Sequence, residues 1–320
     1  MHQILFFHWR LALLSFFAFL SLHSVAFANY SSPTQVLSSS PVKYHVLAGT
    51  DSAKPAVFIL GGGPAFSSWN LEPIQQQIHQ LGHTVYLMDM LGIGENRALL
   101  QPETPLLSQW VEQLETLRRN THPNQSVTLV AHSWGALMAM LYQRTYPDAV
   151  NKVILLNPVD PEKRAMSQLT ETIDKRNRSL QETAWDDESA WEQKTQIDVE
   201  DIPRITLRQI QQVLPTYFLD YEKGKAYAEQ FGTDDFNIDL NVQAWAEYDA
   251  NPIGFDEIRQ WPASYYFLEC NQDYLMPFNL NAMRPQMSFK KVALIDQCGH
   301  FPWIEQPQAF NQYLSEFLRD

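Results

Sequence analysis

This chain of 320 residues is poor in cysteine and in positive charge. Its two cysteines, Cys270 and Cys298, form no Cys-x-x-Cys pair, which excludes the common zinc and dithiol redox motifs. Only 23 Lys and Arg face 36 Asp and Glu, and the net charge of −13 argues against a nucleic-acid partner, which needs clustered basic side chains. Hydrophobic residues make up 45% of the chain, enough for the large core of a globular protein.

The amino-terminal residues have the pattern of a secretory signal peptide. A weakly positive start up to Arg10 is followed by the apolar run Leu11–Leu22, and Ala26–Ala28 offers small residues for cleavage. The run is about half of the roughly 20 residues that span a bilayer, which favours a cleaved signal over a permanent membrane span. We therefore expect residues 1–28 to be removed and the protein to be exported, either periplasmic or secreted. An uncleaved anchor, lengthened by residues 4–7, is the alternative.

After a Ser- and Pro-rich lead-in over residues 29–42, short apolar segments alternate with longer helical patterns. Several of these segments are Val/Ile/Leu runs without polar alternation, as expected for strands buried on both faces of a parallel sheet. The predicted strands are Tyr44–Leu47, Ala56–Leu60, Thr84–Asp89, Val127–Ala131, Lys152–Leu156, Tyr265–Leu268 and Val292–Ile295. Helical patterns such as Leu106–Arg119 and Ala136–Arg144 lie between them. This order predicts an α/β fold with a mostly parallel central sheet.

The alternation of strand and helix stops between residues 161 and 260. This block has a helical pattern and carries 21 Asp and Glu against 11 Lys and Arg, so most of the net negative charge lies in it. The strand pattern resumes at Ala263. We expect residues 161–260 to form a helical cap, inserted into a core made of residues 29–160 and 261–320.

The segment Val127–Ala136 carries the strongest catalytic signal. A buried strand runs into Ser133, with the small residues Ala131 and Gly135 two positions before and after it, and a helix then begins. This is the nucleophile-elbow pattern, in which strand and helix nearly touch and leave room only for small neighbours. The Ser hydroxyl then stands at a helix N-terminus, where the Trp134 N–H and the helix dipole can stabilise an oxyanion. The alternative is a serine that merely caps the helix.

A serine nucleophile needs a base and an acid. In a fold of this kind the chain order is nucleophile, acid, histidine, and His300 is the only histidine after Ser133. The acid should lie just past the end of the preceding strand, where Asp273 is found, with Glu269 and Asp160 as alternatives. Asp273 would hold the imidazole in the productive tautomer and stabilise the imidazolium.

Two glycine-rich segments also follow predicted strands. In Gly61–Ala65, glycines let the backbone approach a substrate and aim an N–H at it, and no Gly-Lys-Ser/Thr of a phosphate-binding loop follows. Gly92–Gly94 lacks the third glycine of a dinucleotide fingerprint and is interpreted as a tight active-site loop. We therefore expect no metal and no organic cofactor.

Together these motifs resemble the α/β-hydrolase superfamily and, within it, the proline iminopeptidase group of serine exopeptidases. Gly61–Ala65 is similar to that group's H-G-G-P-G, Asp89–Asn96 to its D-x-x-G-x-G-x-S, and Ala131–Ala136 to its G-G-S-W-G-S. Gly299–Pro307 is similar to its histidine motif. The resemblance runs from about residue 43 to the end. It implies a serine hydrolase acting on a small-molecule or short-peptide substrate.

The resemblance also implies substrate-binding residues. Gly63 would be the oxyanion donor from the glycine loop. The group binds the free amino terminus of its substrate with cap glutamates, and Trp191 and Glu192 look like one such site. The second expected Glu is missing near Tyr217 and Phe218, the two aromatic residues that we also expect to bind substrate. An exported aminopeptidase is therefore expected. A carboxylesterase or lipase-like hydrolase, favoured by the aromatic residues of the cap, is the alternative, and a non-catalytic hydrolase-like binding protein is a remote one.

The two cysteines lie close to the predicted acid and base. Cys270 is three residues before Asp273 and Cys298 is two before His300, each just past the end of a predicted strand. If those strands are neighbours, the two Cα atoms can come within the roughly 4.4–6.8 Å that a disulfide needs. In an exported protein we expect this bridge, with two separate buried thiols as the alternative.

Overall fold

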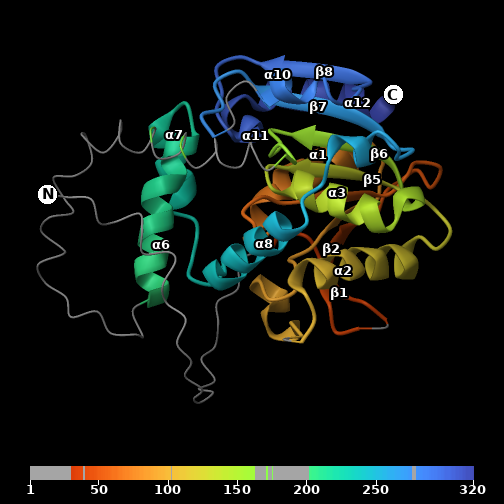
Figure 1. Ribbon diagram of the computed structural model, residues 1–320, viewed down its shortest axis with the longest axis horizontal. Helices are drawn as coiled ribbons and strands as arrows, with labels where there is room; N and C mark the ends of the chain where they lie inside the picture. The colour runs from red at the N-terminus through yellow and green to blue at the C-terminus, as the bar shows by residue number, and fades with distance from the viewer. Residues whose placement is uncertain are drawn as a thin grey trace, which may run out of the picture.

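The computed structural model describes residues 30–38, 40–101, 103–162, 171, 175, 202–275 and 279–320. In these residues eight strands form one sheet, in the order β1-β2-β4-β3-β5-β6-β7-β8, and helices pack on both of its faces (Figure 1). β1 and β2 pair with their neighbours in antiparallel fashion, while all other pairs are parallel. This is the mostly parallel α/β sheet that the sequence predicts.

The strands lie close to the segments predicted for them. They are β1 Thr34–Val36, β2 Lys43–Leu47, β3 Val57–Leu60, β4 Val85–Leu87, β5 Val127–His132, β6 Val150–Leu156, β7 Ser264–Cys270 and β8 Lys291–Ile295. The sequence predicts only an extended lead-in where β1 is found. This short strand pairs with β2 at the edge of the sheet and all its residues are exposed, so it carries no apolar pattern.

Two layers of helices cover the sheet. α2 (Leu106–Thr121) and α3 (Gly135–Thr145) pack on one face, and α1 (Glu72–Gln80) and α12 (Pro307–Arg319) pack on the other. Alternate side chains of the central strand β3 enter alternate clusters, and all four are buried. Burial on both faces explains why this strand is apolar at every position.

Helices also connect β6 to β7, and the described part of this connection contains no strand of the sheet. They are α6 Ile202–Val213, η7 Leu214–Tyr217, α7 Tyr221–Ala228, α8 Ile238–Ala250 and α9 Phe255–Ile258. α8 lies against the core, while α6 and α7 lie farther from the sheet (Figure 1). The shorter helices elsewhere are η2 Trp69–Leu71, η3 Gly94–Leu99, η4 Pro147–Ala149, α10 Asn279–Met283 and α11 Pro302–Glu305.

Three sequence predictions fall outside the described residues: the signal peptide over residues 1–28, Trp191 and Glu192. Among the helices that are described, none is both long enough and apolar enough to cross a membrane.

The parallel strands bring the predicted functional residues to one edge of the sheet. Strands β3 to β8 all run in the same direction, so their carboxyl ends share that edge. Side chains that follow neighbouring strands can therefore converge on one site. Those that matter below are Asp89 after β4, Ser133 after β5, Asn157 after β6, Asp273 after β7 and His300 after β8.

Candidate active site

Ser133 stands at a sharp turn between β5 and α3. Its φ of 56° places it in the left-handed region, which costs energy for a residue with a Cβ. The turn is held by a 3.0 Å hydrogen bond from the Ser133 N–H to the Leu156 carbonyl of β6. A Cβ on Gly135 would clash with the carbonyl oxygen of Leu60. This close approach of helix to strand explains the small residue at position 135.

Asp273 and His300 form a buried hydrogen-bonded pair. Nδ1–H of His300 donates to Oδ2 of Asp273 over 2.8 Å. Asn157 Nδ2 donates to the same oxygen over 2.8 Å, and the Leu275 N–H donates to Oδ1 over 2.9 Å. Burial by itself would raise the pKa of Asp273, but the charge of His300 and these hydrogen bonds outweigh it and lower the pKa. The carboxylate is therefore ionised and fixes which His300 nitrogen carries the proton.

The other nitrogen of His300 is free to act as a base. Its Nε2 is buried and has no hydrogen-bond partner among the described residues, Ser133 included. The ring of His132, the residue before Ser133, packs at a tilt against the His300 ring, with centroids 4.7 Å apart, and its Nε2–H donates to the His300 carbonyl over 2.9 Å. Burial lowers the pKa of His132 to about 3, so this neighbour is neutral. Catalytic hydrogen bonds often tighten only when substrate binds.

The two alternative acids lie elsewhere. Glu269 is buried in β7, and burial together with the charge of Asp273 raises its pKa to about 8. Asp160 accepts a 2.8 Å hydrogen bond from the N–H of Glu162. The structure thus brings Asp273, and neither alternative, into a hydrogen bond with His300.

The glycine loop after β3 lies directly against the nucleophile. A Cβ on Gly62 would stand 3.0 Å from the Cβ of Ser133, so a larger residue there would press on the nucleophile. Gly63 has a φ of 121°, which also favours glycine. Residues before and within α8 hold the loop from the other side, since the Asn237 N–H donates to the carbonyl of Ala65 over 3.0 Å. Of the two predicted oxyanion donors, Trp134 follows Ser133 in the chain, and Gly63 follows Gly62, the glycine that lies against the nucleophile.

An aromatic wall stands beside His300. The Tyr217 ring lies 6.1 Å from the imidazole, roughly perpendicular to it, and Tyr217 and Trp245 both pack against Leu275. Trp245 in turn packs edge-on against Trp134 at 6.1 Å. These side chains form an apolar surface between the cap helices and the nucleophile, suited to an apolar part of a substrate.

Phe218 does not belong to this wall, and its prediction as a substrate-binding residue is corrected here. Its side chain is fully buried and stacks on Phe301, with ring centroids 4.6 Å apart. The two residues of the Tyr-Phe pair have different environments because the chain leaves η7 between them. The sequence pattern of two adjacent aromatic residues does not reveal which one faces the site.

Glu305 joins the cap to the histidine loop. Its buried carboxylate accepts hydrogen bonds from three backbone N–H groups, those of Leu219 (2.9 Å), Asp220 (3.1 Å) and Gly299 (2.6 Å). Two of these donors lie in the cap and the third precedes His300. Glu305 lies inside the histidine motif quoted above, but only the folded chain shows what its carboxylate holds.

The disulfide links the two loops that carry acid and base. Cys270 and Cys298 are bonded, with their Cα atoms 5.3 Å apart. β7 and β8 are neighbours, as this bridge requires. The loops of Asp273 and His300 are thereby covalently connected.

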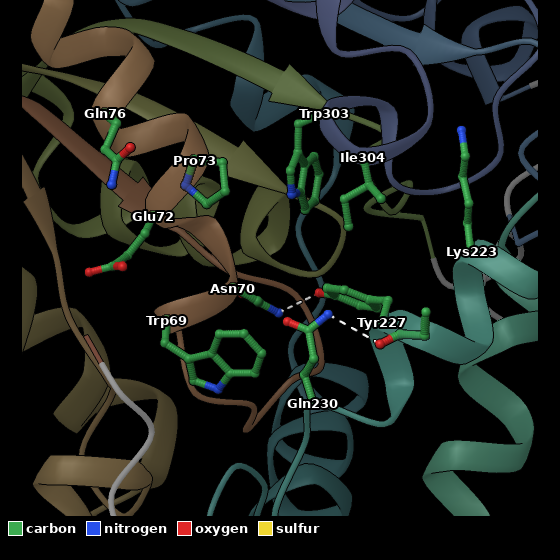
Figure 2. A pocket seen from close by; sticks show the side chains of 11 residues that line it. Trp69, Asn70, Glu72, Pro73, Gln76, Lys223, Tyr227, Gln230, Trp303 and Ile304 are labelled. Atoms are coloured by element: carbon green, nitrogen blue, oxygen red, sulfur yellow. Dashed lines mark hydrogen bonds between the residues drawn. The ribbon is translucent and has the colours of Figure 1, made fainter. Parts of the chain in front are cut away.

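A cavity of about 570 Å³ lies away from these residues, between the start of α1 and helix α7 (Figure 2). Trp69, Lys223 and Trp303 line it, and Asn70 donates a 2.7 Å hydrogen bond to the Tyr227 hydroxyl at its floor. The residues that line it include no pair of nucleophile and base. The described residues also include no group of three or more His, Cys, Asp or Glu arranged to hold a metal ion.

The chain was compared with known proteins. The family model of the alpha/beta hydrolase fold matches residues 55–307. Proline iminopeptidase of Lactobacillus helveticus is 21% identical over 290 residues, covering 86% of this chain and 93% of the relative. Proline iminopeptidase of Lactobacillus delbrueckii subsp. bulgaricus is 24% identical over 286 residues, with the same coverage of 86% and 93%.

Solved structures show the same fold at low identity. A serine hydrolase from the bacterium Cycloclasticus zankles superimposes with a TM-score of 0.64 at 16% identity, covering 90% of this chain and 98% of that one. A thermophilic esterase from Thermogutta terrifontis gives 0.62 at 16% identity, covering 90% and 97%. The match to the family model covers residues 55–307, and the sheet order, the turn at Ser133 and the pairing of Asp273 with His300 agree with it. The chain therefore belongs to the α/β-hydrolase family.

Proposed function

We propose that the protein is a serine hydrolase in which Ser133 is the nucleophile, His300 the general base and Asp273 the orienting acid. The observation that carries this proposal is the 2.8 Å hydrogen bond from His300 Nδ1 to an ionised Asp273, which leaves Nε2 without a partner among the described residues and available to accept a proton. The backbone at Ser133 supports it, because a positive φ is kept at a residue with a Cβ only where the surroundings enforce it.

The reaction follows from these positions. Ser133 Oγ attacks the carbonyl carbon of an ester or amide while His300 Nε2 takes its proton. The N–H groups of Gly63 and Trp134 stabilise the negative charge on the carbonyl oxygen. The C–O or C–N bond then breaks, and His300 returns the proton to the leaving group. Water, deprotonated by His300, hydrolyses the acyl-enzyme and releases a carboxylic acid and free Ser133.

For the substrate, we favour a short peptide or amino-acid amide with a free amino terminus, as for a proline iminopeptidase. The curated relatives and the position of Glu192 beside Trp191 support this choice. A carboxylesterase is the second candidate, supported by the apolar wall of Tyr217, Trp245 and Leu275 next to His300. We further propose that residues 1–28 are a signal peptide and that the enzyme acts outside the cytoplasm. Amino-terminal sequencing of protein from the periplasm should then begin at Asn29.

The serine mechanism is tested with a fluorophosphonate probe. Wild-type protein should be labelled once per chain, and Ser133→Ala should not be labelled and should lose turnover by roughly 10⁴-fold or more. Ser264→Ala is the matched control, because that serine begins β7 at the opposite edge of the sheet. Labelling of folded Ser133→Ala at the wild-type rate would refute the proposal.

The substrate class is tested with three probes: an aminoacyl arylamide, its N-acetyl derivative and a series of acyl esters. An aminopeptidase discriminates for the ammonium group, and a charge-assisted hydrogen bond to Glu192 contributes roughly 1.5–3 kcal/mol. Glu192→Gln should therefore lower kcat/KM for the free amine by roughly 10- to 100-fold, and for the acetylated probe hardly at all. Glu222→Gln, an exposed residue of α7, is the control. Equal hydrolysis of free and acetylated probes by the wild type would favour the esterase.

A further inference from the structure

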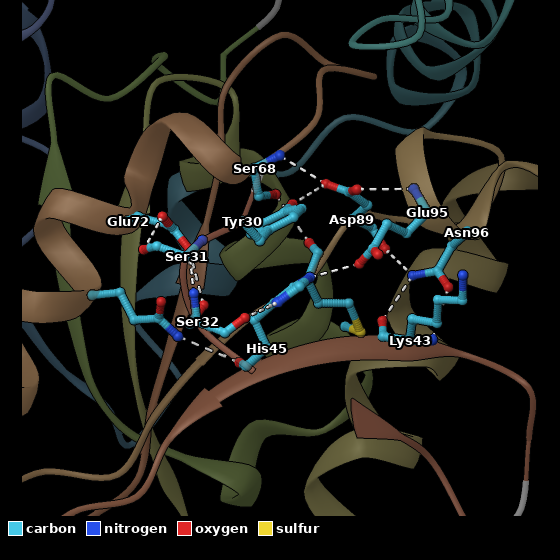
Figure 3. A network of polar contacts seen from close by, with 12 residues as sticks. Tyr30, Ser31, Ser32, Lys43, His45, Ser68, Glu72, Asp89, Glu95 and Asn96 are labelled. Carbon is cyan, nitrogen blue, oxygen red and sulfur yellow. Dashed lines mark hydrogen bonds and ion pairs between the residues drawn. The ribbon is translucent and has the colours of Figure 1, made fainter. Parts of the chain in front are cut away.

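Residues 30–32 lie outside the part of the chain that the family model matches, yet they contact residues next to the loops at the carboxyl edge of the sheet. The Tyr30 ring stacks on His45 of β2, with centroids 3.6 Å apart and planes at 13° (Figure 3). Burial, and then the negative charge of Asp89, raise the pKa of Tyr30 well above its usual value. The phenol is therefore a permanent hydrogen-bond donor.

That donor reaches Asp89 at the carboxyl end of β4. The Tyr30 hydroxyl donates to Oδ1 of Asp89 over 2.5 Å, and the Ser68 N–H donates to the same oxygen over 2.7 Å. The Glu95 N–H donates to Oδ2 over 3.1 Å. A Cβ on Gly94 would clash with Oδ2, so the loop folds tightly over the carboxylate. Asp89 thus joins residue 68, at the downstream end of the glycine loop, to the loop after β4.

A second contact fixes the start of α1. Both serines donate to the Glu72 carboxylate: Ser31 through its N–H (2.7 Å) and hydroxyl (2.6 Å), and Ser32 through its N–H and hydroxyl (3.0 Å each). Glu72 is the first residue of α1 and follows the glycine loop and η2 directly. The amino-terminal segment therefore holds the downstream end of the glycine loop at two points, residues 68 and 72.

His45, on which the Tyr30 ring stacks, is itself held by two contacts. Nδ1–H of His45 donates to the Ser32 carbonyl over 3.0 Å, and Nε2 lies 2.6 Å from the Glu95 carboxylate. The imidazole is buried, so its plane is set by these two contacts. It provides a fixed surface that orients the phenol toward Asp89 (Figure 3).

We propose that residues Tyr30–Ser32 form a strap that positions the glycine loop, and that Tyr30 is a positioning residue that acts through Asp89. This inference rests on the proposed function, because it assigns the N–H of Gly63 to the oxyanion. The glycine loop is anchored upstream by β3, at Ala65 by the Asn237 N–H, and farther downstream by Ser68 and Glu72. Loss of the strap leaves the anchor at β3 intact and loosens the contacts at Ser68 and Glu72. The N–H of Gly63 is then displaced from the position that the transition state needs.

The expected signature is a loss in kcat with little change in KM, because the oxyanion forms only after the ground-state complex. Tyr30→Phe keeps the stacking on His45 and removes only the hydroxyl. We expect it to lower kcat for a p-nitrophenyl ester by about 3- to 30-fold, in line with the cost of small misplacements in active sites. Tyr30→Ala, which also loses the ring, should lower kcat further.

The route through Asp89 is tested by a double-mutant cycle. If the hydroxyl acts on the loop through that carboxylate, Tyr30→Phe should cost much less in an Asp89→Asn background than in the wild type. Additive losses would overturn the route. Tyr266→Phe is the matched control. It also removes a tyrosine hydroxyl that donates to a carboxylate, here that of Asp320, but Tyr266 lies within strand β7 of the sheet. Its kcat should equal that of the wild type.

Fluorophosphonate labelling and the melting temperature Tm separate the possible failures. If wild-type protein is not labelled, the proposed function fails before the strap is tested. If the wild type is labelled and folded Tyr30→Phe has the same kcat and labelling rate, the strap proposal is wrong and the proposed function stands. A variant that melts below the assay temperature is compared at a temperature where both are folded. A loss confined to KM would also overturn the proposal.

Discussion

The main-chain N–H of His300 donates a 2.8 Å hydrogen bond to the carbonyl oxygen of Tyr217. A Cβ on Gly299 would clash with the same oxygen, so the chain that leaves η7 lies directly on the histidine loop. The aromatic side chain beside the base and the backbone of the base are thus held by one contact. Any movement of this part of the cap is transmitted to His300.

Glu305 should be essential for this arrangement. Its carboxylate accepts three backbone N–H bonds, and Glu305→Gln replaces one acceptor oxygen by an NH₂ that faces N–H donors. We expect the free energy of unfolding to fall by about 1–3 kcal/mol and kcat to fall with it. Chemical denaturation and ester hydrolysis measure the two effects. Glu316→Gln is the control: its partner Lys291 is partly exposed, so the free energy of unfolding should change by less than about 1 kcal/mol. Equal effects of the two variants would contradict the role of Glu305.

Asn157 should support catalysis through Asp273. It donates to the oxygen that His300 also uses, and its own φ of 42° is one that glycine tolerates. Asn157→Gly should therefore keep the backbone, remove one hydrogen bond from the carboxylate and lower kcat roughly tenfold. Asn124→Gly is the matched control, an exposed asparagine with a φ of 65°. Wild-type kcat in Asn157→Gly would show that Asp273 needs no second donor.

The stability of the protein should fall as pH rises toward 8, because of Glu269. Burial first, and the charge of Asp273 second, raise its pKa from 4.5 to about 8, so the folded state holds this proton more tightly than the unfolded chain does. This contribution is fully present below pH 4.5 and is lost as pH rises through 8. Linkage gives an effect on the order of 3–5 kcal/mol over that window.

Glu269→Gln cannot ionise and should remove this slope. Urea unfolding at several pH values between about 5 and 8.5 measures the dependence, because over most of that range the folded state holds a proton that the unfolded chain has lost. The variant should be less sensitive to pH than the wild type, with the two curves diverging most at the alkaline end. Parallel curves for the two proteins would mean that Glu269 is ionised in the folded state at neutral pH.

Removal of the disulfide should lower both stability and activity. The bridge closes a loop between residues 28 positions apart, and chain entropy alone predicts a loss of about 3–4 kcal/mol in the free energy of unfolding without it. Replacing both cysteines by Ala should lower Tm and, because the bridge joins the loops of Asp273 and His300, kcat as well. Thiol titration of unfolded, unreduced wild type should find no free thiol. Two free thiols in that titration would contradict the bridge.

Local patterns in the chain are enough to predict most of the strands and helices and their order. Apolar runs predict β2 to β8, most clearly β3, which is buried on both faces and is apolar at every position. The turn at Ser133 could be predicted because strand and helix approach so closely there that position 135 must be small. His300 could be singled out because no other histidine follows the nucleophile. These are local signals, and each is contained in a few neighbouring residues.

Which distant side chains meet depends on how the folded chain packs. Asn157 and Glu305 act on residues 116 and 86 positions away, through hydrogen bonds that no local pattern encodes. Phe218 is packed in the core although its neighbour Tyr217 faces the site, because the backbone turns between them. Tyr30 lies in a segment that resembles a plain lead-in, and its partner Asp89 is 59 residues away. Long-range contacts of this kind depend on how the loops at one sheet edge pack together, which a linear pattern does not record.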